Sequence, residues 1–181
     1  SDIAVLSLNG IVCKTSIKLA GDKFNAAIIK YMRSRYNVLL GERMAERVKI
    51  AIASVDRDAE DKTYEVKGRH LATGLPTKVL LTRRELYPVM VELVDEIRAA
   101  VHSVVERTPP ELVGDIFTNG MVMTGGGAML HGMEVYMSRE LKMPVRLAEN
   151  PVECVAVGTG LSFQYIDQLV DGFVASSTHR H

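Results

Sequence analysis

The spacing of apolar residues changes from a strand-like to a helix-like pattern near position 20 of the 181-residue chain. The runs Ile3 to Leu8 and Ile11 to Leu19 are rich in Val, Ile and Leu, and they are joined through Asn9 and Gly10, a dipeptide that tolerates a tight hairpin turn. We predict two antiparallel strands here. Because both runs are more apolar than a strand with one solvent-exposed face, we expect helices to cover both faces of their sheet.

A helical period replaces the strand pattern after Gly21. Asn37 is expected to end the first helix, and a second helix is predicted from about Glu42 to Ala53, with apolar residues on one side and charged residues on another. The apolar residues that define the face of the first helix recur every four positions: Phe24, Ile28, Met32 and Tyr36.

A polar loop and a hairpin separate these helices from a longer one. Residues 56–62 predict the loop, and residues 63–67 and 78–81 predict the two strands of the hairpin. Thr82 stands three residues before Glu85, the arrangement of a capping box, and apolar residues at helical spacing follow it. We therefore predict a long helix that begins directly after Thr82.

Towards the C-terminus the pattern becomes an alternation of strands and helices. Thr108 and Pro110 mark the start of a short helix, since proline is tolerated in a helix's first turn. Beyond it the sequence predicts a strand at 121–123, a glycine turn at 124–127, a helix over 129–141, a strand at 145–147 and a helix over 154–169.

These elements describe one α/β core interrupted by a small, mostly helical insert that carries a β-hairpin. We place the core at residues 1–19 and 82–172 and the insert at residues 20–81. Residues 173–181 are expected to form a disordered tail. No internal repeat of the solenoid type is present in the sequence.

Charge and composition narrow the function classes. Lys plus Arg and Asp plus Glu both number 22, so the chain lacks the basic excess that nucleic-acid binding requires. Cys13 and Cys154 match no metal spacing and are interpreted as reduced, small apolar residues. The three histidines outside the tail are scattered and predict no metal site: His70, His102 and His131.

The glycine turn is the first candidate for chemistry. A strand that ends in Thr-Gly-Gly-Gly, residues 124–127, and runs into a helix lets the backbone pass close to something flat or anionic, such as a nucleotide. The alternative is an ordinary strand-to-helix turn that needs positive φ angles. The motif is neither a Rossmann nor a Walker pattern, so alone it decides nothing.

The second candidate is a charged pair on the predicted helix at 42–53. Glu46 and Lys49 lie three residues apart and share a face. A carboxylate and an ammonium held together could hydrogen-bond ribose hydroxyls and the edge of a purine. The alternative is a solvated pair within one helix, which contributes little to stability.

Five blocks of the sequence, in order and spacing, resemble the MreB family of bacterial actins. The resemblance covers the chain up to about residue 170. Its blocks are residues 19–22 (Leu-Ala-Gly-Asp), 41–49 (Gly-Glu-Arg-Met-Ala-Glu-Arg-Val-Lys), 73–76 (Thr-Gly-Leu-Pro), 106–112 (Glu-Arg-Thr-Pro-Pro-Glu-Leu) and 124–128 (Thr-Gly-Gly-Gly-Ala).

The resemblance implies an actin-like ATPase core of the ribonuclease H-like kind, with a mixed sheet between helices, and ATP as the ligand. In that superfamily a glycine turn lies along the adenosine, which implies this role for Gly125, Gly126, Gly127 and Ala128. The Glu-Arg-x-Lys block packs on the other side of the base and ribose, which implies that role for Glu46, Arg47, Val48 and Lys49.

The resemblance also implies that the chain is the second domain of a longer protein. The first strand of the core and both phosphate loops of the family have no counterpart in the sequence, and Mg²⁺ is expected to be held by the full-length protein rather than by this fragment. No residue is assigned a catalytic role, and the fragment alone is expected to be inactive. The strand at Ile3 to Leu8 and the strand at 121–123 should flank the place of the absent strand, leaving two edges exposed. Either more chain or self-association of the fragment would cover them.

The implied function is that of a filament-forming cytoskeletal ATPase in the bacterial cytoplasm, which determines rod shape by organising cell-wall elongation. Its implied partners are further copies of itself, elongation membrane proteins such as RodZ, MreC and MreD, and the inner membrane surface, reached mainly through the first domain. Two other readings remain open from the sequence: an ATPase fragment of an Hsp70-type chaperone or sugar kinase, and a pure interaction module for the elongation proteins.

Overall fold

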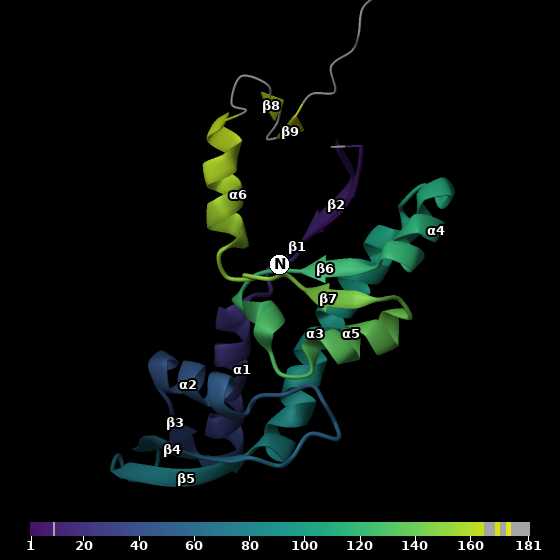
Figure 1. Cartoon of the computed structure of the whole chain (residues 1–181). Helices are drawn as coiled ribbons and strands as arrows, with labels where there is room; N and C mark the ends of the chain where they lie inside the picture. The colour runs from purple at the N-terminus through teal and green to yellow at the C-terminus, as the bar shows by residue number, and fades with distance from the viewer. Residues whose placement is uncertain (9, 165–168, 171–172, 175–181) are drawn as a thin grey trace, which may run out of the picture.

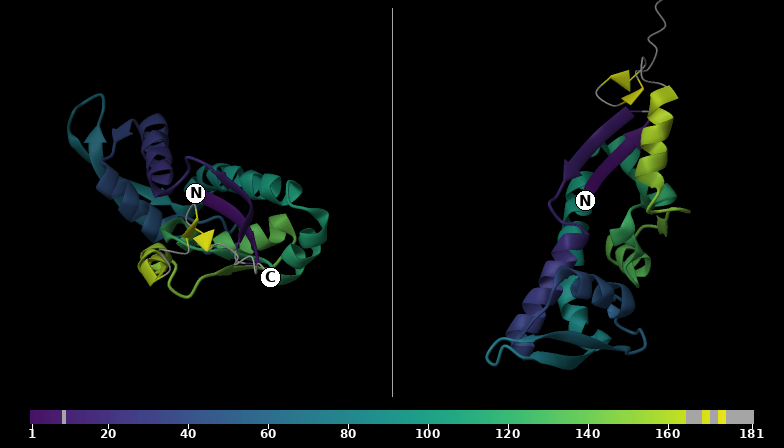
Figure 2. Two further views of the ribbon diagram at one scale, coloured as in Figure 1. Left: turned by 90° about the horizontal axis from the view of Figure 1, so that it is seen from above. Right: turned by 90° about the vertical axis from the view of Figure 1, so that its left-hand side faces the viewer.

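The computed structural model describes residues 1–8, 10–164, 169–170 and 173–174, and it shows an elongated molecule (Figure 1). The sheet β3–β4–β5 lies at one end and helix α6 at the other, with the long helix α3 running between them (Figure 2). In chain order the elements are β1 (Asp2–Ser7), β2 (Gly10–Ser16), α1 (Gly21–Tyr36), β3 (Val38–Leu39), α2 (Glu42–Ile52), β4 (Thr63–His70), β5 (Pro76–Thr82), α3 (Arg83–Glu106), α4 (Pro110–Asn119), β6 (Met121–Met123), the 3₁₀ helix η1 (Gly126–Met129), α5 (Met133–Leu141), β7 (Val145–Leu147), α6 (Cys154–Ser162), β8 (Leu169–Val170) and β9 (Phe173–Val174).

Strands β1 and β2 form the predicted antiparallel hairpin, with Ile3 opposite Thr15 and a register shift between Val5 and Leu6. Asn9, in the predicted turn, lies outside the described residues. Helix α3 packs against one face of the hairpin. Alternate residues on the other face are exposed, and Leu6 keeps 68% of its surface accessible. The expectation that both faces are covered is therefore wrong for the described residues, because packing of α3 accounts for one face only.

Helices α1 and α2 form where the apolar periods predict them and pack against each other. Asn37 ends α1 in a left-handed conformation with φ of 55°, which asparagine tolerates better than most residues. The hairpin strands β4 and β5 are longer than predicted, and β3 extends them into an antiparallel sheet in the order β3–β4–β5. The facing residues of the two helices have almost no exposed surface: Phe24, Ile28, Met32, Ala45, Val48 and Ile52.

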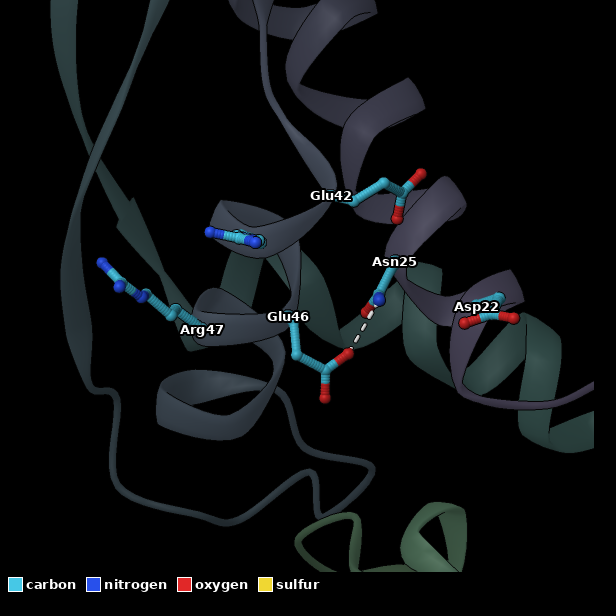
Figure 3. Close-up of a pocket in the computed structure, with 6 residues that line it drawn as sticks. Asp22, Asn25, Glu42, Glu46 and Arg47 are labelled. Atoms are coloured by element: carbon cyan, nitrogen blue, oxygen red, sulfur yellow. Dashed lines mark hydrogen bonds between the residues drawn. The ribbon is translucent and has the colours of Figure 1, made fainter.

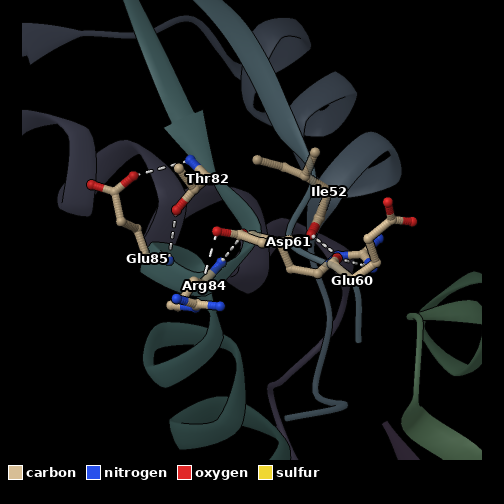
Figure 4. A network of polar contacts seen from close by, with 7 residues as sticks. Ile52, Glu60, Asp61, Thr82, Arg84 and Glu85 are labelled. Carbon is tan, nitrogen blue, oxygen red and sulfur yellow. Dashed lines mark hydrogen bonds and ion pairs between the residues drawn. The ribbon is translucent and has the colours of Figure 1, made fainter. Parts of the chain in front are cut away.

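The start of α3 is held by the predicted capping box (Figure 4). The hydroxyl oxygen of Thr82 accepts a hydrogen bond from the Glu85 amide at 3.1 Å, and the Glu85 carboxylate accepts one from the Thr82 amide at 3.0 Å. Buried Arg83 follows, and its guanidinium donates to the carbonyl oxygens of Ile52 at 3.1 Å and Glu60 at 3.0 Å. These bonds tie the end of α2 and the loop after it to the first turn of α3.

The glycine stretch differs from the predicted strand–turn–helix. Strand β6 pairs in parallel with β7, as in an α/β core, but η1 follows the turn and α5 begins only at Met133. Gly125 has φ of +84° and Gly132 has φ of +80°, so each breaks the helical path. The predicted helix start at residue 129 is wrong for this reason.

The predicted helix over residues 154–169 is wrong at its C-terminal end. Helix α6 stops at Ser162, and Leu169–Val170 pairs with Phe173–Val174 as a short antiparallel ladder. Two glycines, Gly158 and Gly160, together with β-branched residues lower the helix propensity of this segment. The second strand falls at the start of the stretch that the sequence predicts to be a disordered tail, and residues 175–181 lie outside the described residues.

The core strands form two separate two-stranded ladders, β1–β2 and β6–β7. Among the described residues, β1 has no partner other than β2, and β6 has none other than β7. Helix α6 stands apart from helices α1 to α5 and carries large exposed apolar residues, with Val155 at 72% and Val157 at 54% exposure (Figure 2). A considerable apolar surface therefore lies open at this end of the molecule.

One hydrophobic cluster runs through both predicted units, from Phe24 and Met32 to Met90 and Met137. The boundary between a core and an insert at residues 20–81 stays a prediction. Within the described part of the chain no helix is both long and apolar enough to cross a membrane. Cys13 and Cys154 are free thiols, as predicted.

Candidate functional site

Helix α2 presents Glu46 and Lys49 as a pair, as their spacing predicts. The Lys49 ammonium donates to Glu46 Oε2 at 2.7 Å, and it lies 3.4 Å from the carbonyl oxygen of Gly21 at the start of α1. The Lys49 side chain is 16% exposed and that of Glu46 is 43% exposed. The pair therefore lies at the junction of two helices, with its carboxylate towards solvent.

Asn25 of α1 is a third member of this cluster. Its side-chain amide donates to Glu46 Oε2 at 2.7 Å, and Figure 3 shows the two side chains pointing towards each other. Sequence reasoning missed Asn25, although there was a signal. It is a polar residue beside Phe24 in the buried stripe of α1, and it is only 5% exposed.

The electrostatics of the cluster favour an ionised Glu46. The hydrogen bond from Lys49 and then the one from Asn25 lower the pKa of Glu46 below its ordinary value, against the opposite effect of burial. Both donors bind Oε2, and among the described residues Oε1 has no hydrogen-bond partner. A charged acceptor atom is thus left free in a fixed side chain.

This cluster borders an open hollow of about 740 Å³ between α1 and α2. Arg47 extends away from Glu46 and Asn25 in Figure 3. Val48 has no exposed surface, so its side chain is not accessible to a ligand. The residues that line the hollow are Asp22, Asn25, Glu42, Arg43, Glu46 and Arg47.

The glycine turn is bare on its outer side. Gly125 requires glycine for its φ of +84°, and its amide donates to the carbonyl oxygen of Pro151 at 2.6 Å. At Gly126 and Gly127, by contrast, an added Cβ would meet no atom of the chain within 4 Å, and neither has a positive φ. Ala128 packs against the core. The chain's own contacts therefore give no reason for glycine at two of the three positions.

A β-bridge connects α2 with the segment that follows the glycine turn. The Val55 amide donates to the carbonyl oxygen of His131 at 2.9 Å, and buried Ser54 lies against the same histidine. Gly132 passes so close to Asp56 that an added Cβ would lie 2.6 Å from it. No hydrogen bond of the described residues joins Glu46 or Lys49 directly to residues 125–128. The hydrogen bonds to His131 therefore connect the segment after α2 with the segment after the glycine turn.

The groups at this site can bind a ligand. The hollow offers a carboxylate acceptor and guanidinium donors, and the turn offers exposed backbone. In the described part of the chain, no group of three or more His, Cys, Asp or Glu residues is placed to hold a metal ion. The Glu46 oxygen that is unpaired among the described residues suits a ligand with hydroxyl or amino donors.

Comparison with known proteins gives consistent matches. The family model described as MreB/Mbl protein matches residues 1–171. The cell shape-determining protein Mbl of Bacillus cereus is 46% identical over 169 residues, which are 93% of this chain and 51% of that protein. The cell shape-determining protein MreB of Escherichia coli is 42% identical over 92% of this chain and 48% of its own length.

Solved structures of similar fold agree with the family match. MreB5 of Spiroplasma citri bound to ADP superimposes with a TM-score of 0.87 at 34% identity, covering 92% of this chain and 51% of that one. The same protein bound to AMPPNP gives the same TM-score. MamK, seen as a double helical filament, matches with a TM-score of 0.65 at 17% identity, a likeness of fold alone.

The predicted fold class is confirmed by these matches, which place the chain in an actin-like ATPase fold. The chain spans about half the length of the curated relatives it matches. The order of the five sequence blocks, the parallel β6–β7 pair before and after the glycine turn, and the match over residues 1–171 all lead to one assignment. The chain belongs to the MreB/Mbl family of cell shape-determining proteins.

Proposed function

We propose that this chain supplies the nucleoside side of an ATP cleft in a cell shape-determining protein. Glu46 and Lys49 receive the ribose hydroxyls or the edge of the base, and the backbone of Gly125, Gly126 and Gly127 lies along its flat face. The observation that carries the proposal is the bare backbone at Gly126 and Gly127, where the chain itself has no need of glycine. The ADP and AMPPNP bound to MreB5 support it.

The remaining expected residues take lesser roles in this proposal. Arg47 lines the same hollow and would lie at its outer rim, and Ala128 would contribute backbone only, since its side chain packs inward. Val48 would contribute only by holding α2 on the core. When bound, Mg²⁺ would neutralise phosphate charge, and we expect the full-length protein rather than this fragment to hold it.

The experiment is a titration of the chain with adenosine and ADP, followed by ligand-observed NMR. We expect weak binding of both ligands, and loss of that binding in Gly126→Val and in Lys49→Ala. Lys78→Ala is the matched control, because Lys78 pairs with Glu65 at 3.1 Å on the exposed hairpin away from the hollow. Equal affinity in all four proteins would overturn the proposal.

For the whole protein we propose ATP-dependent assembly into protofilaments that organise cell-wall elongation. Residues 20–81 would form a separate unit that contacts the core of the next subunit. Elongation membrane proteins such as RodZ, MreC and MreD would dock on this domain, and filaments would lie on the cytoplasmic face of the membrane. Family membership favours this reading over a chaperone or a sugar kinase. Electron microscopy of a full-length protein with ATP tests it, and persistent monomers would contradict it.

A further inference from the structure

Asn25 is a buried polar residue that forms a hydrogen bond with Glu46. It lies in the apolar stripe of α1 with 5% of its surface exposed, and its amide reaches across to Glu46 on α2 at 2.7 Å. Its own carbonyl oxygen, Oδ1, is buried and has no hydrogen-bond partner. An amide in this position therefore makes one good hydrogen bond and leaves one polar atom unsatisfied.

Stability alone does not account for this amide. A buried acceptor without a partner is unfavourable, and a leucine of similar shape would fill the same place without it. Glu46 does not need the bond for solvation either, because its side chain is 43% exposed and already paired with Lys49. The Asn25 amide thus supplies an interaction that neither the core nor Glu46 requires.

The bond does, however, fix the carboxylate relative to a second helix. Lys49 lies on the same helix as Glu46, and its own contact with α1 is a long one, 3.4 Å to the carbonyl oxygen of Gly21. Asn25 comes from α1 and binds the same oxygen, Oε2. The two donors together occupy Oε2 and leave Oε1 for another donor at the border of the hollow.

We propose that Asn25 is a positioning residue for nucleoside binding: it holds Glu46 so that Oε1 accepts hydrogen bonds from the hydroxyl or amino donors of the ligand. This inference rests on the function proposed above. According to this inference, Asn25 raises ligand affinity while it lowers the stability of the fold. A merely structural residue would affect the two in the same direction.

The test is a double-mutant cycle on the chain, with ADP as the probe and ligand-observed NMR as the readout. Asn25→Leu is expected to weaken ADP binding about tenfold, the usual effect of losing a hydrogen bond to a charged group. Its Tm is expected to stay equal or to rise. In a Glu46→Ala background, which has no acceptor for the Asn25 amide, Asn25→Leu should cause no further loss of ADP affinity, because Asn25 acts through Glu46.

Controls separate this inference from the proposed function. Asn119→Leu makes the same exchange at the exposed end of α4 and should leave affinity unchanged. Asn25→Ala repeats the test without the bulk of leucine in case leucine does not pack. If Glu46→Ala leaves ADP affinity unchanged, the proposed function and this inference both fail. If Glu46→Ala weakens binding but both Asn25 variants bind normally, or lose the same affinity again in the Glu46→Ala background, only this inference is overturned.

Discussion

The hydroxyl oxygen of Ser54 lies 2.9 Å from Nδ1 of His131, although the two residues are 77 positions apart in the chain. Ser54 also accepts a hydrogen bond from the Asp56 amide at 3.0 Å, and it has no exposed surface. It follows the helix that carries Glu46, and His131 follows the glycine turn. This contact therefore sets the position of one part of the candidate site relative to the other.

Replacement of Ser54 by alanine should lower both stability and nucleotide affinity. The change leaves the Asp56 amide without its partner, which is expected to reduce the free energy of unfolding by about 1–3 kcal/mol. Urea denaturation measures this, and ADP titration measures the accompanying loss of affinity. Ser34→Ala is the control, since the exposed Ser34 hydroxyl bonds only the Tyr31 carbonyl nearby. Equal stability of both variants would mean that the Ser54 contacts contribute nothing.

Alanine substitutions at Gly126 and Gly120 should differ strongly in their effect on the free energy of unfolding. At Gly126 an added Cβ meets nothing within 4 Å, so Gly126→Ala should change the free energy of unfolding by no more than about 0.5 kcal/mol. At Gly120, with φ of +78°, an added Cβ would clash with the carbonyl oxygen of Pro144. Gly120→Ala should therefore destabilise the chain by several kcal/mol, about 3 or more, because backbone must shift as well. Thermal unfolding followed by circular dichroism compares them, and similar Tm values would contradict the prediction.

Removal of the capping hydroxyl at Thr82 should weaken the start of α3. Thr82→Ala loses the bond to the Glu85 amide and is expected to lower the free energy of unfolding by about 1 kcal/mol. Thr82→Ser keeps the hydroxyl and should stay close to the parent chain. Chemical denaturation of the three proteins measures the difference, and an alanine variant as stable as the serine variant would argue against the cap.

Alkaline pH should destabilise the contact between α3 and α5. Burial, followed by the hydrogen bond to Asp95 at 2.9 Å, raises the pKa of Tyr136 from 10.0 to about 12. The folded-state pKa is the higher one, so the contribution is fully present below pH 10 and is lost as pH rises towards 12. At pH 11.5 the loss amounts to about 2 kcal/mol.

Tyr136→Phe tests this directly by urea denaturation at pH 9 and pH 11.5. The variant should start less stable than the parent at pH 9 and lose less stability at the higher pH. Tyr36, whose pKa is also raised to about 12, first by its hydrogen bond to Glu85, remains in the variant and accounts for part of the loss that persists. An identical pH profile in parent and variant would rule out a role for Tyr136.

The features that the sequence predicts well are local ones. Thr82 and Glu85 are three residues apart, so their capping box depends on one turn of chain and forms as expected. Asn37 ends α1 for a similarly local reason. The hydrogen bond from Asn25 to Glu46 depends on α1 packing against α2, and nothing within 20 residues of Asn25 in the sequence indicates it. This hydrogen bond can be recognised only once the packing of α1 against α2 is known.

The glycine turn is a second case in which the sequence predicts a feature but not its details. Its three glycines predict an unusual backbone, but only Gly125 has one, and the sequence does not distinguish it from Gly126 and Gly127. The helix expected at residue 129 is delayed because Gly132 takes its own positive φ where it passes Asp56. Asp56 lies in a loop 76 positions earlier in the chain, and the spacing of apolar residues does not predict a contact over that distance.

If a second copy of the chain covers the apolar residues of helix α6, the stability of the chain depends on its own concentration. The helix carries no charged residue from Cys154 to Ser162, and Val155, Val157 and Leu161 are each more than half exposed. Any surface that buries them binds the folded form and not the unfolded one, so association and folding are thermodynamically linked by mass action. Unfolding midpoints should rise with protein concentration, and comparisons between variants require the same molarity throughout.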